Sequence, residues 1–381
     1  MVCAETHARL QNCAPASLLR RMPVPLFDTS TPLAPLQARI RERIHAVIEG
    51  GRYILGPEVE AFEREFAAYV GATHAIGVAN GTDAITLALR ALGVGPGDEV
   101  VVPSFTFYAS AEAIPPTGAK PVFCDVDPET FCVTPETVRA ALTPRTKAVI
   151  VVHLFGNVAP VGEIAALGVP VLEDAAQAAG SRSPKGRPGA LGALATFSFF
   201  PSKNLGAFGD GGAVTTSDPE LEERVRMLRF HGSRDKTTFE LVGHNSRLDE
   251  LQAAILRVQL PELEGWCDGR RAAAAHYEAA GLGEHVALPR PLGEPAWHLY
   301  VIRHERAEEL AAALAAAGVG NKAYYRVPAH RQPAMRAFGD GAALPGTDEA
   351  ARTHLAIPMS PVLSRGQADE VVAAVRDARL G

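Results

Sequence analysis

Lys203 stands in an unusual setting for a lysine, between the apolar run FSFF and the glycine-rich stretch GAFGDGG. A lysine amine is a nucleophile only when it is neutral, and partial removal from water lowers its pKa toward that state. The aromatic residues would supply apolar walls, and the glycines would let the backbone come close to a ligand. A lysine on a solvated surface is the commoner arrangement, so this stretch alone leaves both interpretations open.

A second stretch, VANGTDAITLAL, places Gly81 and Thr82 between a strand-like run and a good helical pattern. The first amides of a helix have no partners within the helix, and beside a small hydroxyl they form a ready phosphate site. The stretch lacks the lysine of a Walker loop and is not a dinucleotide-binding fingerprint. An ordinary threonine cap is the alternative interpretation.

Glu173 and Asp174 end the apolar part of VPVLEDAAQAAG, and Gln177 follows them. Open α/β sheets bind their ligands at the carboxyl ends of parallel strands. Burial of a carboxylate at such a position is costly unless a cation lies nearby. An aspartate that only caps the next helix is the alternative.

Taken together and in this order along the chain, these features match the needs of pyridoxal phosphate. Lys203 would form the Schiff base, and Asp174 would pair with the protonated pyridine nitrogen and keep the ring an electron sink. The helix amides at Gly81 and Thr82 would hold the phosphate. Chance assembly of all three is much less frequent than any one alone, so the residues predict this cofactor.

The elements that must position these residues follow an alternating pattern. Short runs rich in Val, Ile and Phe are bounded by turn residues and lie at 74–80, 99–107, 121–126, 148–156 and 169–176. Helical patterns separate them, which predicts an α/β fold whose mostly parallel sheet is covered by helices on both faces.

The strand signals become sparse after residue 218. One long helical pattern covers 246–281, with a kink expected at Pro261, and it suits a connector between domains. We therefore predict a large cofactor-binding domain at 23–260 and a smaller C-terminal α+β domain at 261–381. The smaller domain would contain an alanine-rich helix at 306–317 and a terminal helix at 366–381.

Residues 1–22 lack the apolar core of a signal peptide. We interpret them as an N-terminal extension, either a disordered tail or the result of an upstream start with Met22 as the effective beginning.

Composition excludes several classes of protein. The chain has 381 residues, enough for two domains, and a formal net charge of −6. Mild acidity argues against nucleic acid as a partner, and no apolar run approaches the roughly 20 residues that span a bilayer. The five cysteines are scattered without CxxC or metal-ligand spacing, which indicates reduced thiols in a cytoplasmic protein and predicts no metal site.

From about residue 23 to the C-terminus the chain resembles the DegT/DnrJ/EryC1/StrS group of pyridoxal-phosphate sugar aminotransferases, within the aspartate aminotransferase superfamily of fold type I. The resemblance rests on LGPEVEAFEREFAAYVG, ANGTDAITLALRALGVGPGDEVVVPSFTF, EDAAQAAG, FSFFPSKNLGAFGDGGAV and NSRLDELQAAIL.

The resemblance implies roles for individual residues. Lys203 corresponds to the Schiff-base lysine, Asp174 to the partner of the pyridine nitrogen and Gln177 to the residue that binds the ring hydroxyl. Phe107 corresponds to the aromatic stacked on the ring, with the adjacent Tyr108 as the alternative. The residues that correspond to phosphate ligands are Gly81, Thr82, Ser198 and, donated from the neighbouring subunit, Asn245. The last correspondence implies a homodimer with shared active sites.

The segment NKAYYRVPAHRQPAM resembles the part of the family that helps bind the sugar nucleotide. Tyr325, His330 and Gln332 are the candidates that it offers, although Arg326 and Val327 depart from the usual pattern. A structural turn anchored by prolines is the alternative for each of the three.

The implied activity is transfer of an amino group from an amino acid, by resemblance L-glutamate, to a nucleotide-linked keto-sugar. It would proceed through the Lys203 internal aldimine and a pyridoxamine phosphate intermediate. One subgroup of the family has histidine in place of this lysine and removes a hydroxyl, so Lys203 favours transamination. A sugar dehydratase, a cyclitol aminotransferase and a non-catalytic regulatory protein that binds the cofactor are the alternatives.

Overall fold

The computed structural model describes residues 24–339 and 341–380. A seven-stranded sheet lies at its centre, in the order β1-β7-β6-β5-β4-β2-β3. Its strands are β1 (His74–Val78), β2 (Glu99–Pro103), β3 (Lys120–Cys124), β4 (Thr146–Val152), β5 (Val171–Asp174), β6 (Leu194–Ser198) and β7 (Gly212–Thr216). Strand β7 runs antiparallel to β1 and β6, and the remaining pairs are parallel, which confirms the mostly parallel sheet.

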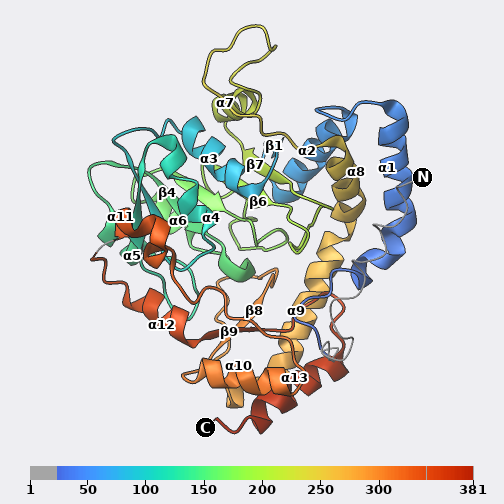
Figure 1. Cartoon of the computed structure of the whole chain (residues 1–381), viewed down its shortest axis with the longest axis vertical. Coiled ribbons are helices and arrows are strands. Elements are labelled where there is room, and N and C mark those ends of the chain that lie inside the picture. Colours follow the sequence, from blue (N-terminus) through green and yellow to red (C-terminus); the bar gives the residue numbers. More distant parts are fainter. Residues whose placement is uncertain (1–23, 340, 381) are drawn as a thin grey trace, which may run out of the picture.

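Helices cover the sheet, whose strands are almost wholly buried. They are α1 (Gln37–Gly50), α2 (Pro57–Val70), α3 (Gly81–Ala91), α4 (Ala109–Glu112), α5 (Pro135–Ala141), α6 (Val161–Ala165), α7 (Pro219–Arg229) and α8 (Glu250–Gln259). Helix α3 packs on β6 and β7 through an apolar face, while α2 packs on β1 and α8. The sheet and these helices fill the upper part of Figure 1.

The lower part of Figure 1 is built around a two-stranded antiparallel sheet. The elements of the C-terminal part of the chain are α9 (Leu263–Ala279), β8 (Tyr300–Arg303), α10 (Ala307–Ala316), α11 (Arg336–Gly339), α12 (Pro345–Thr353), β9 (His354–Ile357) and α13 (Arg365–Asp377). Of these, α11 lies level with the large sheet in Figure 1 and packs on β3. Short 3-10 segments connect elements throughout: Thr31–Leu36, Pro115–Thr117, Leu154–Gly156, Leu260–Glu262, Leu282–Glu284, Ala329–Arg331 and Pro333–Met335. One of them, which contains Pro261, separates α8 from α9 at the expected interruption.

The domain boundary at residue 260 stays a prediction. A separate apolar core joins α9, β8, α10, β9 and α13, whereas Val301, Ala329 and Ala356 belong to the core of the large sheet. The predicted N-terminal extension, 1–22, lies outside the described residues. Within the described part, Cys124, Cys132 and Cys267 are free and buried, and no helix has both the length and the apolar character needed to cross a membrane.

Candidate active site

A cavity of about 840 Å³ lies where β5 and β6 end and α3 begins. Val152, Asp174 and Ser198 line it from the strands, and 322–325 lines it from the C-terminal part of the chain. This is the edge of the sheet at which open α/β folds bind ligands, and the volume suits a small-molecule site.

Gly81 lines one end of the cavity, and both Gly81 and Gly212 allow close approach of the backbone there. The side chain of Asn80 caps α3 by accepting a hydrogen bond from the Asp83 amide at 2.8 Å. A Cβ on Gly81 would lie 2.8 Å from the Cβ of Ser198, and one on Gly212 would lie 2.5 Å from the Asn80 carbonyl carbon. Only glycine lets the start of α3 approach the end of β6 so closely.

The predicted phosphate ligands Gly81, Thr82 and Ser198 are therefore adjacent in space. The amides of Gly81 and Thr82 have no hydrogen-bond partner among the described residues, which leaves them available to an anion at the helix N-terminus.

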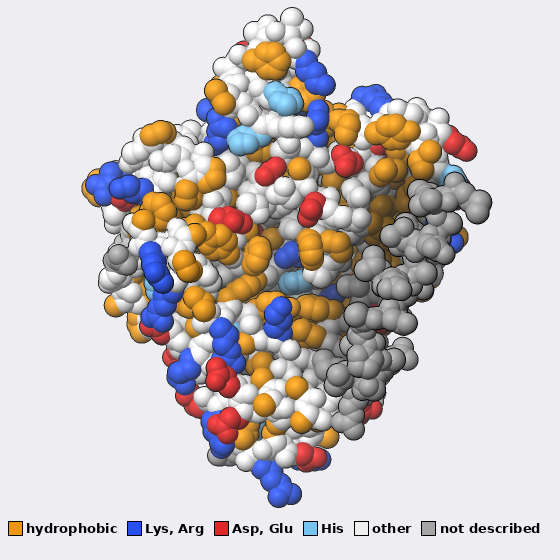
Figure 2. All heavy atoms as spheres, in the orientation of Figure 1, with side chains coloured by type: hydrophobic (Ala, Val, Ile, Leu, Met, Phe, Trp, Pro, Cys, Tyr) orange, Lys and Arg blue, Asp and Glu red, His pale blue; other side chains and the backbone are white. Residues whose placement is uncertain are grey.

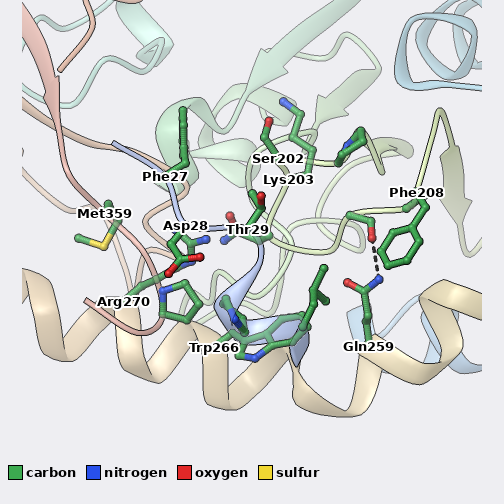
Figure 3. A pocket seen from close by; sticks show the side chains of 17 residues that line it. Phe27, Asp28, Thr29, Ser202, Lys203, Phe208, Gln259, Trp266, Arg270 and Met359 are labelled. Atoms are coloured by element: carbon green, nitrogen blue, oxygen red, sulfur yellow. Dashed lines mark hydrogen bonds between the residues drawn. The ribbon is translucent and has the colours of Figure 1, made fainter. Parts of the chain in front are cut away.

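Lys203 lies on the loop after β6 and lines the same cavity. Its amide donates to the Phe200 carbonyl at 2.8 Å, and the Gln259 side chain donates to the Gly206 carbonyl at 2.8 Å, so both sides of the loop are anchored. Figure 3 shows a smaller neighbouring cavity on the backbone side of this loop, with the Lys203 side chain directed away from Trp266 and Gln259. Burial lowers the pKa of Lys203 to about 8, and the charge of Asp174 opposes that shift.

Asp174 is held by two further groups. Ser110 donates a hydrogen bond to Oδ2 at 2.7 Å, and the Ala176 amide donates to Oδ1 at 3.2 Å. Because the Ser110 proton points to the carboxylate, its oxygen accepts from Thr106, 3.0 Å away. Thr106, Ser110 and Asp174 are all buried, so this chain of hydroxyls fixes the carboxylate within the cavity.

Gln177 connects the sheet to the C-terminal part of the chain. Its Oε1 accepts from the Phe155 amide at 2.7 Å, and its Nε2 donates to the Tyr325 hydroxyl at 3.2 Å. Burial raises the pKa of that hydroxyl, which keeps it protonated. Phe107 lines the mouth of the cavity, half exposed, with its ring 5.9 Å from the Tyr325 ring.

Three predicted residues lie outside the cavity lining. His330 is buried against the Ser104 hydroxyl, and the Gln332 side chain donates to the Val327 carbonyl at 3.1 Å. Asn245 is exposed on the segment that protrudes between α7 and α8 (Figure 1).

The structure adds residues that sequence reasoning missed. Ser110 donates a hydrogen bond to Asp174, and Thr106 is hydrogen-bonded to Ser110. Three further residues line the cavity: His298, Lys322 and Tyr324. The position of His298 directly before the strand-like run LYVIR was the one signal available for that residue. The described residues contain no group of three side chains placed to hold a metal ion.

The residues present fit pyridoxal phosphate. The cradle of Gly81, Thr82 and Ser198 can hold its phosphate, Asp174 can pair with the pyridine nitrogen, and the Lys203 amine can hold the aldehyde. Such a site in a fold of this kind defines a pyridoxal-phosphate-dependent enzyme.

Comparison with known proteins supports this class of enzyme and identifies the family. Residues 35–376 match the model of the DegT/DnrJ/EryC1/StrS aminotransferase family, and the chain belongs to that family. It is 47% identical to dTDP-3-amino-3,4,6-trideoxy-alpha-D-glucose transaminase of Streptomyces venezuelae, with 93% of this chain and 96% of that protein covered. It is 45% identical to a pleiotropic regulatory protein of Geobacillus stearothermophilus (92% and 97% covered). It is also 43% identical to UDP-N-acetyl-3-dehydro-alpha-D-glucosamine 3-aminotransferase of Acidithiobacillus ferrooxidans (93% and 97% covered).

Solved structures share the fold. DesV of Streptomyces venezuelae, in complex with a ketimine intermediate, superposes with a TM-score of 0.90 at 46% identity, over 94% of this chain and 99% of that one. NtdA of Bacillus subtilis, with bound cofactor PMP, gives a TM-score of 0.86 at 29% identity, over 93% of this chain and 85% of that one. The predicted family, fold, class of enzyme and cofactor are confirmed.

Proposed function

We propose that this enzyme transfers an amino group from L-glutamate to a nucleotide-linked keto-sugar. The observation that carries the proposal is that Lys203, Asp174 and the cradle of Gly81, Thr82 and Ser198 all open into one cavity. The dTDP- and UDP-sugar transaminases, 47% and 43% identical over nearly the whole chain, support a nucleotide sugar as the acceptor.

Each residue of the site has a separate task in this proposal. Pyridoxal phosphate, when bound, supplies an electron sink for the bond cleavages at the donor's α-carbon. The Lys203 amine would hold the cofactor at rest. Once released, it would take the proton from the donor's α-carbon and pass it to the cofactor carbon, and in the second half-reaction it would move a proton from there to the keto-sugar carbon that receives the amine. Ser110 keeps the Asp174 carboxylate in place for the pyridine nitrogen, and Gln177 presents its amide to the ring hydroxyl.

Lys322 and Tyr324 suit the nucleotide at the mouth of the cavity. The Lys322 ammonium lies 4.9 Å from the centre of the Tyr324 ring, and among the described residues it has no carboxylate within ion-pair distance. An exposed cation with no acidic partner beside aromatic rings complements a diphosphate that carries a base. Tyr325 lies deeper, against Gln177.

A homodimer with shared sites forms part of the proposal. The segment between α7 and α8 protrudes from the molecule (Figure 1), and Arg90 holds it by donating to the Val242 carbonyl at 2.6 Å. Phe239 and Val242 on this segment are 60% and 81% exposed, and Asn245 is exposed beside them. Hydrophobic side chains also spread across the middle of the face in Figure 2. A second copy of the chain would cover such apolar surface and receive Asn245.

The test uses purified protein and a panel of nucleotide-linked keto-sugars with L-glutamate. The expected results are a visible absorption band of the bound cofactor, formation of 2-oxoglutarate, and an amino sugar identified by mass spectrometry and NMR. Lys203→Ala should lose the covalent absorption band and the turnover. Wild-type protein that takes up the cofactor and forms 2-oxoglutarate, yet aminates no nucleotide sugar, would contradict the proposed acceptor and favour a cyclitol or another ketone.

A regulatory role without turnover is the second candidate, because a relative that is 45% identical is named a regulatory protein. Single-turnover spectra distinguish the two. Protein that binds pyridoxal phosphate but converts it with no amino donor would support regulation, whereas conversion to the pyridoxamine spectrum by glutamate would exclude a purely regulatory protein.

A further inference from the structure

A second cavity, of about 220 Å³, lies on the backbone side of the loop that carries Lys203 (Figure 3). Its walls come from four parts of the chain that are far apart in sequence: 27–33, the loop 201–208, the region of α8 and α9, and 359–361. More than half of the lining residues are apolar, among them Phe27, Leu33 and Trp266. A hollow with apolar walls and a few polar groups is the usual form of a small-molecule site.

Arg270 enters this cavity from α9 with most of its donors unused. It is only 8% exposed, and its Nη1 donates to the Trp297 carbonyl at 3.1 Å. Among the described residues the guanidinium has no other hydrogen bond and no carboxylate within ion-pair distance. Burial closes off Nε but not Nη2, and because Arg270 lines the cavity, Nη2 opens into it.

The described residues include one other buried arginine, Arg229, which shows what Arg270 lacks. Arg229 donates to the Glu63 carboxylate at 2.6 Å and to the Gly77 carbonyl at 2.6 Å. A charge removed from water is costly unless an opposite charge or a set of hydrogen bonds compensates it. Burial lowers the pKa of Arg270 to about 10, and no carboxylate offsets that cost. A ligand carboxylate at Nη2 would supply the missing partner, since free guanidinium donors match its geometry.

Asp28 brings a negative charge to the same cavity. In Figure 3, Asp28 and Arg270 lie at the same end of it, away from Phe208. The Asp28 Oδ1 accepts from the Ser30 and Thr31 amides at 3.1 and 2.9 Å, whereas Oδ2 has no partner among the described residues and no ion pair joins it to Arg270. This carboxylate would repel a simple anion, so a ligand that suits both groups carries a positive charge as well as a negative one.

The side-chain amide of Asn204, also in the lining, is already engaged. Its nitrogen donates to the Ala296 carbonyl at 3.0 Å, so its oxygen faces His298 and accepts from Nδ1 at 3.2 Å. The charged groups of Arg270 and Asp28 are therefore the ones left to orient a ligand.

We propose that this cavity binds a small α-amino acid, whose carboxylate pairs with Arg270 and whose ammonium group faces Asp28. The apolar walls would receive a short apolar side chain. The site is separate from the place where an amino donor would meet the Lys203 amine, because that side chain points away from this cavity. Phe27, Ser202 and Lys203 line both cavities, so the bound amino acid would contact the loop that carries the lysine. The inference goes beyond the proposed function and depends on no particular acceptor.

The experiment compares L-alanine with propionate, which differ by one ammonium group, in calorimetric titrations of the holoenzyme. Treatment with borohydride first converts the link between Lys203 and the cofactor to an unreactive secondary amine, so that amino acids no longer react there. Arg270→Met removes the guanidinium, and Asp28→Asn removes the negative charge. The control Arg224→Met removes an exposed arginine of α7 that does not line the cavity.

The wild type should bind L-alanine at least about tenfold more tightly than propionate, the worth of one hydrogen bond between charged groups. Arg270→Met should weaken alanine binding by at least about tenfold for the same reason. Asp28→Asn should abolish the preference for alanine over propionate, and Arg224→Met should change neither affinity. Equal affinities in the wild type, unaltered alanine binding in Arg270→Met, or an equal loss in the control overturns the proposal.

A crystal structure of the wild-type chain with L-alanine covers the case in which Arg270→Met does not fold. It should show the alanine carboxylate at Nη2 of Arg270 and the ammonium group at Oδ2 of Asp28. An empty cavity at saturating alanine, or alanine bound only beside the Lys203 amine, refutes the proposal. A protein that takes up no cofactor is titrated without borohydride and still yields these results, so failure of the proposed function is recognised separately.

Discussion

Gly81→Ala tests whether close contact between α3 and β6 creates the cofactor's phosphate cradle. The new methyl group would lie 2.8 Å from the Ser198 Cβ and 3.3 Å from its Cα. The second of these atoms is backbone, so rotation of a side chain cannot relieve the contact. The start of α3 must move away from the end of β6, which separates the predicted phosphate ligands.

The magnitude follows from the geometry. Carbon atoms in ordinary contact are about 3.5–4.0 Å apart, so the substitution requires a displacement of roughly 1 Å. Overpacking of this kind costs about 1–3 kcal/mol. If the bound phosphate requires the original spacing, the dissociation constant of pyridoxal phosphate should rise by about 5- to 150-fold.

The assay is a fluorescence or absorbance titration of cofactor-free protein with pyridoxal phosphate. Gly50→Ala is the matched control, because a Cβ at the last residue of α1 meets no atom within 4 Å. A second comparison uses the Ser198→Gly background, in which the Cβ nearest to the new methyl group is absent. There Gly81→Ala should cost much less affinity than in the wild type.

Two results would refute the reasoning. Equal cofactor affinity in Gly81→Ala and wild type would show that the cradle does not bind the phosphate. An equal loss of affinity in the wild-type and Ser198→Gly backgrounds would show that the alanine acts on the start of the helix and not through its contact with β6.

Three further predictions concern groups in and around the site. The rate of covalent capture of pyridoxal phosphate should rise with pH with a midpoint of about 8, because only the neutral Lys203 amine reacts; a midpoint near the ordinary lysine value contradicts this. Ser110→Ala should lower the free energy of unfolding by about 1.5–3 kcal/mol in urea and weaken cofactor binding, since Asp174 loses a buried donor; unchanged stability speaks against it. Glu250→Gln should destabilise the protein by at least about 2 kcal/mol, because the buried carboxylate accepts three amides at the start of α2; an unaltered urea midpoint would exclude that role.

Most of the large sheet could be predicted from the sequence because its strands are short continuous apolar runs. The direction of β7 could not, since pairing with β1 and β6 depends on contacts between segments far apart in the chain. Strand β9 was also missed. Its four residues, HLAI, follow α12 without an intervening turn signal, and so short a run is not distinguishable from the end of a helix.

The site residues also divide into those marked by a local sequence pattern and those whose role depends on contacts between distant segments. Gly81, Asp174 and Lys203 each stand where an apolar run ends, so local pattern was enough to single them out. Ser110 is 64 residues from Asp174, and His298 is 94 residues from Asn204. Their roles depend on which strand and loop ends the fold brings together, and a serine or a histidine has no local signature for that.

Glu173 shows how two adjacent carboxylates can have different tasks. Side chains alternate across a strand, so Glu173 faces away from the cavity that Asp174 enters. Burial of Glu173 was expected to require a cation; instead, its oxygens accept from His153 at 2.9 Å and from three backbone amides of 189–192 at 2.7–3.1 Å.

The His153 ring accepts the Ala159 amide at Nδ1, which leaves Nε2 to donate to Glu173 and keeps the imidazole neutral. The carboxylate is thus compensated by hydrogen bonds, and it ties β5 to the segment that enters β6. Because β5 carries Asp174 and β6 leads to Ser198 and Lys203, Glu173 fixes the relative position of the groups that would hold the two ends of the cofactor.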